Sequence, residues 1–243
     1  MAGHSHWAGI KHKKGRQDSL RSKIFSKISR EITVAAKLGS KDPQTNHRLR
    51  AAIETAKDAN MPKDNINRAI SRSDVNKNEN FENLRYEGFG PKNTALIIEA
   101  LTDNKNRTAS KIRTILQKFG GNLGSSGSTA HFFHNCGVIQ VPKKSITDEA
   151  LLDFAAKSGA KDCFSFKSFH EIITRKEDFY KIKIEAEKII KKFIYSDIEW
   201  RPKNPINLNI EEEKLVLGMI ELLDEDDDIQ KVFYNCKLSM VSK

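Results

Sequence analysis

The residues best suited to chemistry lie in the first thirty positions of the chain. Eight of these thirty side chains are lysine or arginine and one is acidic, so this segment carries +7 of a total charge of +10. Folding gains nothing from so many like charges, whereas a polyanion such as nucleic acid offsets their repulsion. Imidazole and indole rings between the cations suit stacking on bases or sugars. The predicted contact residues are His4, His6, Trp7, Lys11, His12, Lys13, Lys14 and Arg16.

The charge is concentrated in the first third of the chain. Residues 1–80 hold 17 lysines and arginines against 8 acids, a net charge of +9, and the remaining residues hold 25 against 24, a net charge of +1. The alternative interpretation of the N-terminal segment is a flexible basic tail that only keeps the protein in solution. The rings among the cations favour the nucleic-acid contact.

Three other clusters suggest chemistry less strongly. The glycine-rich segment 120–128 lacks the Gly-Lys-Ser/Thr of a phosphate loop and follows a predicted helix rather than a strand. We therefore interpret it as a helix end and a turn. Its serines could contact a phosphate backbone. His131 and His134 would point to opposite faces of a strand, and His134 with Cys136 supplies only two of the usual four zinc ligands. His4, His6 and His12 form a similarly weak cluster. We therefore expect no metal.

The acidic run 224–228, DEDDD, lies near the end of a predicted helix, where the helix dipole disfavours acids. We favour a solvated loop. The alternative is an acidic patch that holds the basic region when no nucleic acid is bound. No nucleophile, base and orienting acid stand in a known motif, so we expect neither an enzyme nor a cofactor.

The chain of 243 residues is long enough for two or three domains. Its three cysteines are far apart and odd in number, which is typical of reduced thiols in a cytosolic protein. No segment approaches the roughly 18 apolar residues of a membrane span, and no signal peptide is recognisable. We therefore expect a cytoplasmic monomer that does not contact membranes.

Three helices are predicted to position the basic residues. Leu20, Ile24, Ile28 and Ile32 recur every four residues and form one apolar stripe. Lys23, Lys27, Arg30 and Lys37 fall on a separate face, which is either an ordinary solvated surface or a continuation of the basic contact. Helices over residues 48–59 and 63–72 follow, with the outward cations Arg48, Arg50, Lys63, Arg68 and Arg72. Residues 73–83 are interpreted as a linker.

Strand and helix patterns alternate after this linker. A buried strand is predicted at 95–101, a helix at about 106–119 and a further strand at 128–133. The next segment begins with a strand at 137–141 and continues with a helix at 148–158, a hairpin, a helix at 179–193 and a strand. This order is typical of a ferredoxin-like unit. A last helix (211–223) and strand (232–238) are surplus to that unit. They either complete the earlier sheet or form an appendage packed on the third part.

These patterns predict an α+β protein in which an N-terminal helical bundle precedes two α/β (ferredoxin-like) lobes, one inserted in the other. The predicted domains are residues 1–83, residues 84–136 plus 206–243, and an inserted lobe of residues 137–205.

Several motifs resemble those of the YebC/PmpR family. They are GHSHWAGIKHKKGRQD (3–18), DANMPKDNI (58–66), YEGFGP (86–91), LTDNKNRT (101–108) and GGNLGSSGS (120–128). The resemblance implies a helical first domain, two α/β lobes and a role in gene expression, either as a DNA-binding transcriptional regulator or as a ribosome-associated factor that relieves stalling at difficult stretches such as proline runs. It also implies that residues 11–16, with Lys23, Lys27 and Arg30, form the nucleic-acid surface.

We therefore expect a non-enzymatic translation factor that binds ribosomal RNA, with tRNA as a further ligand, through the basic segment and the first helix. A segment of glycine, lysine, histidine and tryptophan suits irregular RNA better than a regular major groove. The alternative is a sequence-specific DNA-binding regulator.

Overall fold

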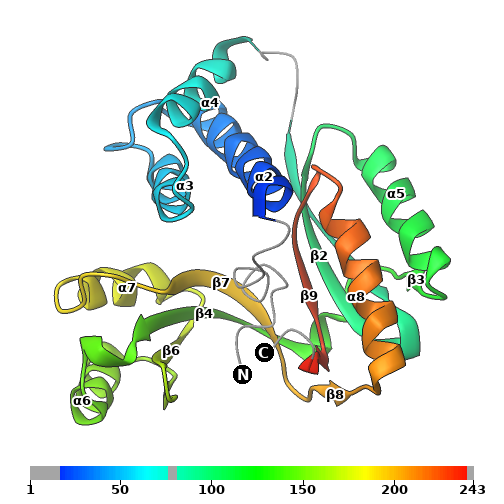
Figure 1. Ribbon diagram of the computed structural model, residues 1–243. Coiled ribbons are helices and arrows are strands. Elements are labelled where there is room, and N and C mark those ends of the chain that lie inside the picture. The colour runs from blue at the N-terminus through cyan, green and yellow to red at the C-terminus, as the bar shows by residue number, and fades with distance from the viewer. Residues whose placement is uncertain (1–16, 76–80, 240–243) are drawn as a thin grey trace. The chain divides into compact units, whose positions relative to one another are not determined.

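The structure is a computed structural model that describes residues 17–75 and 81–239. Its first elements are the helices α2 (Gln17–Leu38), α3 (His47–Asp58) and α4 (Lys63–Val75) (Figure 1). Helix α2 packs against both of the others, and the core between them contains Ile32, Leu49 and Ala56, all fully buried. The alanines at the contact positions allow the helix backbones to approach closely. The predicted helices are therefore present, with ends that differ by a few residues.

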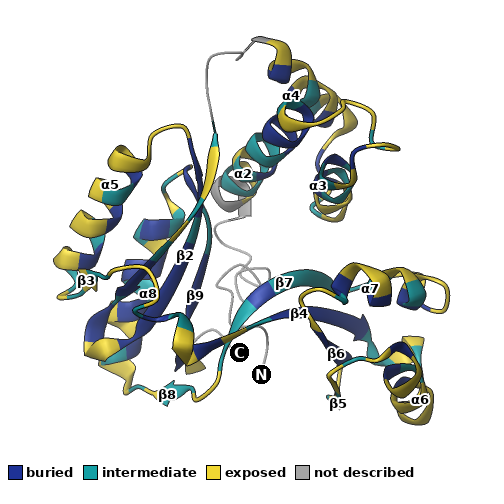
Figure 2. Ribbon diagram, turned by 180° about the vertical axis from the view of Figure 1, so that it is seen from behind, coloured by how far each residue is buried: buried dark blue, intermediate teal, exposed yellow. Residues whose placement is uncertain are grey.

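A four-stranded sheet follows, with the order β3-β1-β2-β9. Its strands are β1 (Glu82–Phe89), β2 (Ala95–Thr102), β3 (Asn122–Leu123) and β9 (Ile229–Tyr234), all paired antiparallel. Helices α5 (Lys105–Lys118) and α8 (Ile210–Asp224) share one apolar core with β2 and β9. Figure 2 shows this core as the buried residues along β2 and β9. Strand β9 thus pairs with β2, which precedes it by more than a hundred residues in the chain.

Residues 130–205 form a second compact unit, and the first unit combines the described residues up to Thr129 with those from Ile206 onwards. The second unit contains β4 (Phe133–Pro142), α6 (Asp148–Ser158), β5 (Asp162–Ser165), β6 (Phe169–Arg175), α7 (Phe179–Glu187) and β7 (Tyr195–Pro202). Its sheet has the order β5-β6-β4-β7 with every pair antiparallel. This is the ferredoxin-like βαββαβ arrangement. The predicted fold class is confirmed, including the insertion of one lobe into the other.

The remaining elements are short. Three 3₁₀ turns, η1 (Pro91–Asn93), η2 (Ala130–Phe132) and η3 (Lys143–Ser145), connect larger elements, and β8 (Ile206–Asn207) pairs in parallel with β10 (Cys236–Lys237). No helix in the described residues is long and apolar enough to cross a membrane. The described cysteines Cys136, Cys163 and Cys236 are free thiols.

Four sequence-based boundaries are wrong. The proposed linker 73–83 contains the end of α4 and the start of β1, whose eight residues pair with the whole of β2. The two strands predicted at 128–133 and 137–141 are one strand, β4, and the residues before Phe133 form turns instead. Because β4 is continuous from Phe133, the second unit begins at Ala130 rather than at Gly137. Helix α7 ends at Glu187, earlier than the predicted Phe193.

Candidate nucleic-acid interface

The basic N-terminal segment lies outside the described residues. The predicted contacts His4, His6, Trp7, Lys11, His12, Lys13, Lys14 and Arg16 all fall in it. Their role remains a prediction. The rest of the predicted interface, Lys23, Lys27 and Arg30, lies on helix α2 and is described in full.

These three cations of α2 face the acidic run 224–228. Spacings of four and three residues put them on one side of the helix. The Lys23 ammonium lies 3.2 Å from the Glu225 carboxylate, and the Lys27 ammonium lies 3.3 Å from that of Asp224. The Arg30 guanidinium donates to the Asp228 carboxylate at 2.5 Å. The basic face of α2 therefore binds a row of carboxylates that come from the end of α8.

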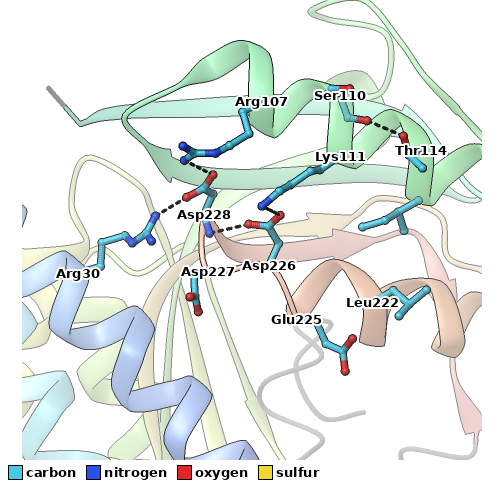
Figure 3. Close-up of a pocket in the computed structure, with 11 residues that line it drawn as sticks. Arg30, Arg107, Ser110, Lys111, Thr114, Leu222, Glu225, Asp226, Asp227 and Asp228 are labelled. Atoms are coloured by element: carbon cyan, nitrogen blue, oxygen red, sulfur yellow. Dashed lines mark hydrogen bonds and ion pairs between the residues drawn. The ribbon is translucent and has the colours of Figure 1, made fainter. Parts of the chain in front are cut away.

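Asp228 is the most enclosed member of this row. Its side chain is only 4% exposed, and its second oxygen accepts from the Arg107 guanidinium at 2.8 Å and from the Thr108 hydroxyl at 2.9 Å. Figure 3 shows Arg30 and Arg107 converging on this carboxylate from α2 and α5. Burial alone would raise the pKa of Asp228, but the hydrogen bonds from Arg107, Arg30 and Thr108 outweigh it and lower the pKa to about 2. The carboxylate is therefore charged at neutral pH.

The other acids of the run are also paired. Asp226 accepts an ion pair from Lys111 at 2.9 Å, and the Ser26 hydroxyl donates to Asp227 at 3.3 Å. The run does form a turn before β9 with Glu225 and Asp227 exposed, but the buried Asp228 and the pairing of the acids do not fit a simple solvated loop. The partners of the acidic run come from α2 and α5, which are distant in the chain, so the sequence around the run does not reveal them. A cavity of about 640 Å³ lies beside the run, lined by residues of α5 and by the acids themselves (Figure 3).

The motif LTDNKNRT, residues 101–108, builds this acid-binding site. Thr102 and Thr108 donate hydroxyl groups towards Asp228, and Asn104 caps α5 by accepting from the Arg107 amide at 3.0 Å. The cap fixes the first turn of α5 and so aims Arg107 at the carboxylate. Sequence reasoning recognised the motif but missed this role, because the Asp228 it serves is distant in the chain.

The five outward cations of the helical region differ in their environment. Arg48 makes a bidentate pair with Glu31, with donor–acceptor distances of 2.7 and 3.0 Å, and Arg50 donates to the carbonyls of Pro43 and Gln44. Both therefore fasten the helical region internally. Lys63, Arg68 and Arg72 on α4 are exposed. Only these three remain accessible as predicted.

The glycine-rich segment 120–128 is structural at its start. A methyl group on Gly121 would lie 2.2 Å from the carbonyl oxygen of Phe89, so only glycine fits where this segment passes β1. Gly120 has a φ of +74° at the end of α5. Nearby, the buried Glu87 carboxylate accepts from the Thr129 amide at 2.8 Å. The segment follows helix α5 and contains the short strand β3 and the start of a turn, which is not the strand-loop-helix geometry of a nucleotide loop.

The second unit contains a cluster of Ser165, His170 and Asp148 that resembles a catalytic triad in composition. Among the described residues, no group of three or more His, Cys, Asp or Glu side chains could hold a metal ion. The Ser165 hydroxyl lies 3.0 Å from His170 Nδ1 and donates to Asp148 at 2.5 Å. A catalytic triad would place the acid on the second histidine nitrogen, but His170 Nε2 lies 2.9 Å from the Ile146 carbonyl oxygen, and the ring is fully buried. We interpret this cluster as a cap on the first turn of α6.

Two family models match the chain. The one described as the TACO1/YebC protein N-terminal domain matches residues 5–75, and the one described as the TACO1/YebC second and third domain matches residues 81–236. The chain belongs to the TACO1/YebC family. The resemblance inferred from the motifs is therefore confirmed.

Relatives of this TACO1/YebC protein extend over nearly the full length. A probable transcriptional regulatory protein of Pelagibacter ubique (strain HTCC1062) is 54% identical over 235 residues, which cover 97% of this chain and 98% of the relative. A protein of the same description from Zymomonas mobilis is 46% identical over 235 residues, which cover 97% of this chain and 94% of the relative. The crystal structure of a conserved hypothetical protein from Aquifex aeolicus is similar with a TM-score of 0.81 and 42% identity, covering 96% of this chain and 97% of that one.

Proposed function

We propose that this protein is a non-enzymatic, nucleic-acid-binding regulator of gene expression. In this proposal it acts in the cytoplasm as a ribosome- and RNA-associated translation factor that relieves stalling, for example at proline runs. The regulatory role is supported by the names of its relatives, which are called probable transcriptional regulatory proteins. Translation as the regulated process is the finer part of the proposal.

One observation carries the proposal. Lys23, Lys27 and Arg30 each contact a carboxylate of the same acidic run. A helix face that holds a row of carboxylates has the cationic donors that a row of phosphates needs, because both groups are recognised by charge-assisted hydrogen bonds. The basic segment that precedes α2 in sequence adds four further cations, at positions 11, 13, 14 and 16. Together they form a continuous cationic stretch of sequence.

RNA is favoured over duplex DNA by the residue types. Proteins that read a major groove place polar side chains of one helix against base edges. The three α2 cations recognise charge rather than base edges. The glycine-spaced segment with Trp7 and its histidines suits stacking on unpaired bases, which RNA loops and ends supply. The α/β lobes would then contribute shape and docking surface on a ribosomal particle.

A DNA-binding transcriptional regulator is the second candidate. Residues 59–62 join α3 to α4 in a short turn, as in a helix-turn-helix, and α4 carries exposed polar residues outside the groove, such as Asn67 and Ser71. A sequence-specific footprint on promoter DNA at physiological salt would support this candidate. Binding that is independent of DNA sequence, together with co-sedimentation with ribosomes, would support the first.

The proposal is tested by the salt dependence of RNA binding. Replacing Lys11, Lys13, Lys14 and Arg16 by alanine removes up to four phosphate contacts, so the slope of log K against log salt should fall by about 2.8 on single-stranded RNA. The matched control replaces four exposed lysines of the second unit, Lys181, Lys188, Lys191 and Lys192, and changes the net charge equally. An unchanged slope in the first variant, or an equal fall in both, would show that the basic segment is not the contact.

The ribosome part of the proposal has its own test. Native protein should co-migrate with ribosomal particles in a sucrose gradient at low salt, and the fourfold alanine variant should remain at the top. Ribosome profiling of a strain that lacks the protein should reveal new pauses, including pauses at proline runs. Normal profiles together with altered transcript levels would instead favour the DNA-binding candidate.

A further inference from the structure

A groove between α2 and α4 is the strongest unassigned feature of the described residues. Its volume is about 490 Å³, and Phe81, the residue just before β1, is one of the residues that line it. Three arginines line it: Arg30 from α2, and Arg68 and Arg72 from α4. The last two lie one turn apart, so their guanidinium groups come from the same side of α4.

The groove is cationic and has no internal acid to balance it. No aspartate or glutamate is among the described residues that line it. Arg68 donates to the Asn65 amide oxygen at 3.0 Å, which is a neutral partner, and Arg72 has no hydrogen-bond or ion-pair partner among the residues described. Arg30 is paired with Asp228 outside the groove. The charges of Arg68 and Arg72 are thus available to an anion.

Two aromatic rings, Phe25 and Phe81, also line the groove, and each lies beside an arginine of α2. The Arg30 guanidinium carbon lies 5.6 Å from the centre of the Phe81 ring, and that of Arg21 lies 5.4 Å from the centre of Phe25. Phe25 also packs against the helical core. Phe81 is half-buried and belongs to none of the core clusters of the described residues. Phe81 is therefore the ring able to offer its surface to a ligand.

The remaining wall supplies small polar groups. Ser22 and Ser29 line the groove beside Asn65, and Ser26 lines it as well, although its hydroxyl donates to Asp227. Hydroxyl and amide groups of this size hydrogen-bond to phosphate or ribose oxygens. Cations, small donors and one ring together match the parts of a nucleotide.

We propose that this groove binds one nucleotide unit of single-stranded RNA, with the phosphate on Arg68 and Arg72 and an unpaired base against Phe81. This inference rests on the proposed function, because it assumes that the protein binds RNA, and it assigns a second contact beyond the N-terminal segment. Duplex DNA is disfavoured as the ligand, since a base within a stacked duplex cannot lie against a side-chain ring.

The experiment measures binding of the full-length protein to a fluorescein-labelled 12-mer of oligouridylate by anisotropy across a salt series. The test variant is Arg68→Gln with Arg72→Gln, and the matched control is Lys57→Gln with Lys63→Gln, two exposed cations of the helical region that do not line the groove. Both variants lose two positive charges. The test variant should bind roughly tenfold more weakly, with a salt slope lower by about 1.4, because two phosphate contacts are lost. The control should change little.

The role of the Phe81 ring is tested by a separate binding measurement. Phe81→Leu should weaken binding to the oligouridylate several-fold but leave binding to an abasic oligomer of the same length unchanged, since only the former can stack. A circular dichroism spectrum and melting temperature like those of the unchanged protein establish that each variant is folded.

The outcomes separate this inference from the proposed function. If the arginine variant and the lysine variant lose the same affinity for oligouridylate, the groove is not the binding site and the effect is one of net charge. An unchanged affinity of the arginine variant would also overturn the assignment of the groove. If replacing Lys11, Lys13, Lys14 and Arg16 nevertheless weakens RNA binding strongly, the proposed function stands. Tighter binding of a 12-base-pair DNA duplex than of the oligouridylate would overturn the assignment to RNA. No binding of either nucleic acid at low salt would overturn both proposals.

Discussion

Arg30 and Asp228 are 198 positions apart in the chain, yet the guanidinium of one lies 2.5 Å from the carboxylate of the other. Arg30 also donates to the carbonyl oxygen of Leu101 at 3.1 Å. A single side chain of α2 thus contacts both β2 and the segment before β9. The same arginine lines the proposed RNA groove. Arg30 therefore connects the acidic run to the wall of the groove proposed to bind RNA.

Asp228 should make the stability of the first unit depend on pH. Its pKa of about 2 lies below the value of about 3.9 for an unfolded aspartate, so its stabilisation is complete above pH 4 and is lost as the pH falls towards 2. Asp228→Asn should lower the free energy of unfolding by roughly 2 kcal/mol at pH 6. Urea unfolding followed by circular dichroism should show this difference shrinking towards zero at pH 2.

The control for that prediction is Asp227→Asn. Asp227 is adjacent and exposed, and it accepts only a 3.3 Å hydrogen bond from Ser26. Its substitution should change stability by less than about 0.5 kcal/mol at either pH, as for most surface positions. A gap between the unchanged protein and Asp228→Asn that stays constant from pH 6 to pH 2 would contradict the role assigned to Asp228.

Neutralising the acids that face α2 should strengthen RNA binding. Asp224→Asn with Glu225→Gln releases Lys27 and Lys23 from their ion pairs and removes two negative charges that repel phosphate. We expect affinity for single-stranded RNA to rise several-fold at low salt and the gain to fade as salt increases. Fluorescence anisotropy titrations at several salt concentrations would measure this change in affinity.

The matched control for the acid pair is Glu177→Gln with Glu187→Gln, two exposed acids of the second unit. It changes the net charge by the same amount without touching α2. If both pairs increase affinity equally, the effect is one of net charge alone. In that case the acidic run does not compete with RNA for the basic face.

Arg201 should be essential to the stability of the second unit. It donates to both oxygens of Glu171, at 2.7 and 2.6 Å, and to Glu199 at 2.6 Å, and both carboxylates are nearly fully buried. Arg201→Met would leave two buried carboxylates without their cation, at a cost of about 3–5 kcal/mol near neutral pH. Thermal unfolding followed by the fluorescence of Trp200 on β7 would detect it.

The pH dependence of this variant distinguishes charge from packing. Burial already raises the pKa of Glu199, against the opposing effect of Arg201. Without the arginine the pKa rises further, so the stability lost by Arg201→Met should be partly regained as the pH falls from 8 to 5 and the carboxyl groups take up protons. Arg175→Met, at an exposed end of β6, should show neither effect. A loss that is equal at both pH values would point to packing alone.

Gly121 should tolerate no side chain. Its added methyl group would meet the Phe89 carbonyl oxygen at 2.2 Å, and backbone atoms can move away only by disturbing the pairing of β1 with β3. Gly121→Ala should therefore destabilise the first unit by about 1–3 kcal/mol or more. Amide hydrogen exchange should show faster exchange in β1, whereas Gly218→Ala, whose nearest neighbour lies at 3.3 Å, should cost little. Equal exchange in both variants would contradict this account.

Periodic patterns in the sequence were enough to predict the fold class. Ile28 and Ile32 of the apolar stripe are buried in the helical core. The order βαββαβ, predicted within residues 137–205, is the order of β4, α6, β5, β6, α7 and β7. Such patterns are local, because helix and strand periods express which face of each element is buried. Strand β1 escaped detection since most of its residues are exposed or half-buried, so it has no apolar alternation.

By itself the sequence determined the elements, the family and the concentration of cations in the first third of the chain. The tertiary structure alone decided which of those cations are engaged. Arg48 and Arg72 look alike in the sequence, but the guanidinium of Arg48 is held by Glu31 while Arg72 lines a groove without acids. The physical reason is that charge pairing depends on distances of a few ångströms, which only the packing of segments far apart in the chain determines.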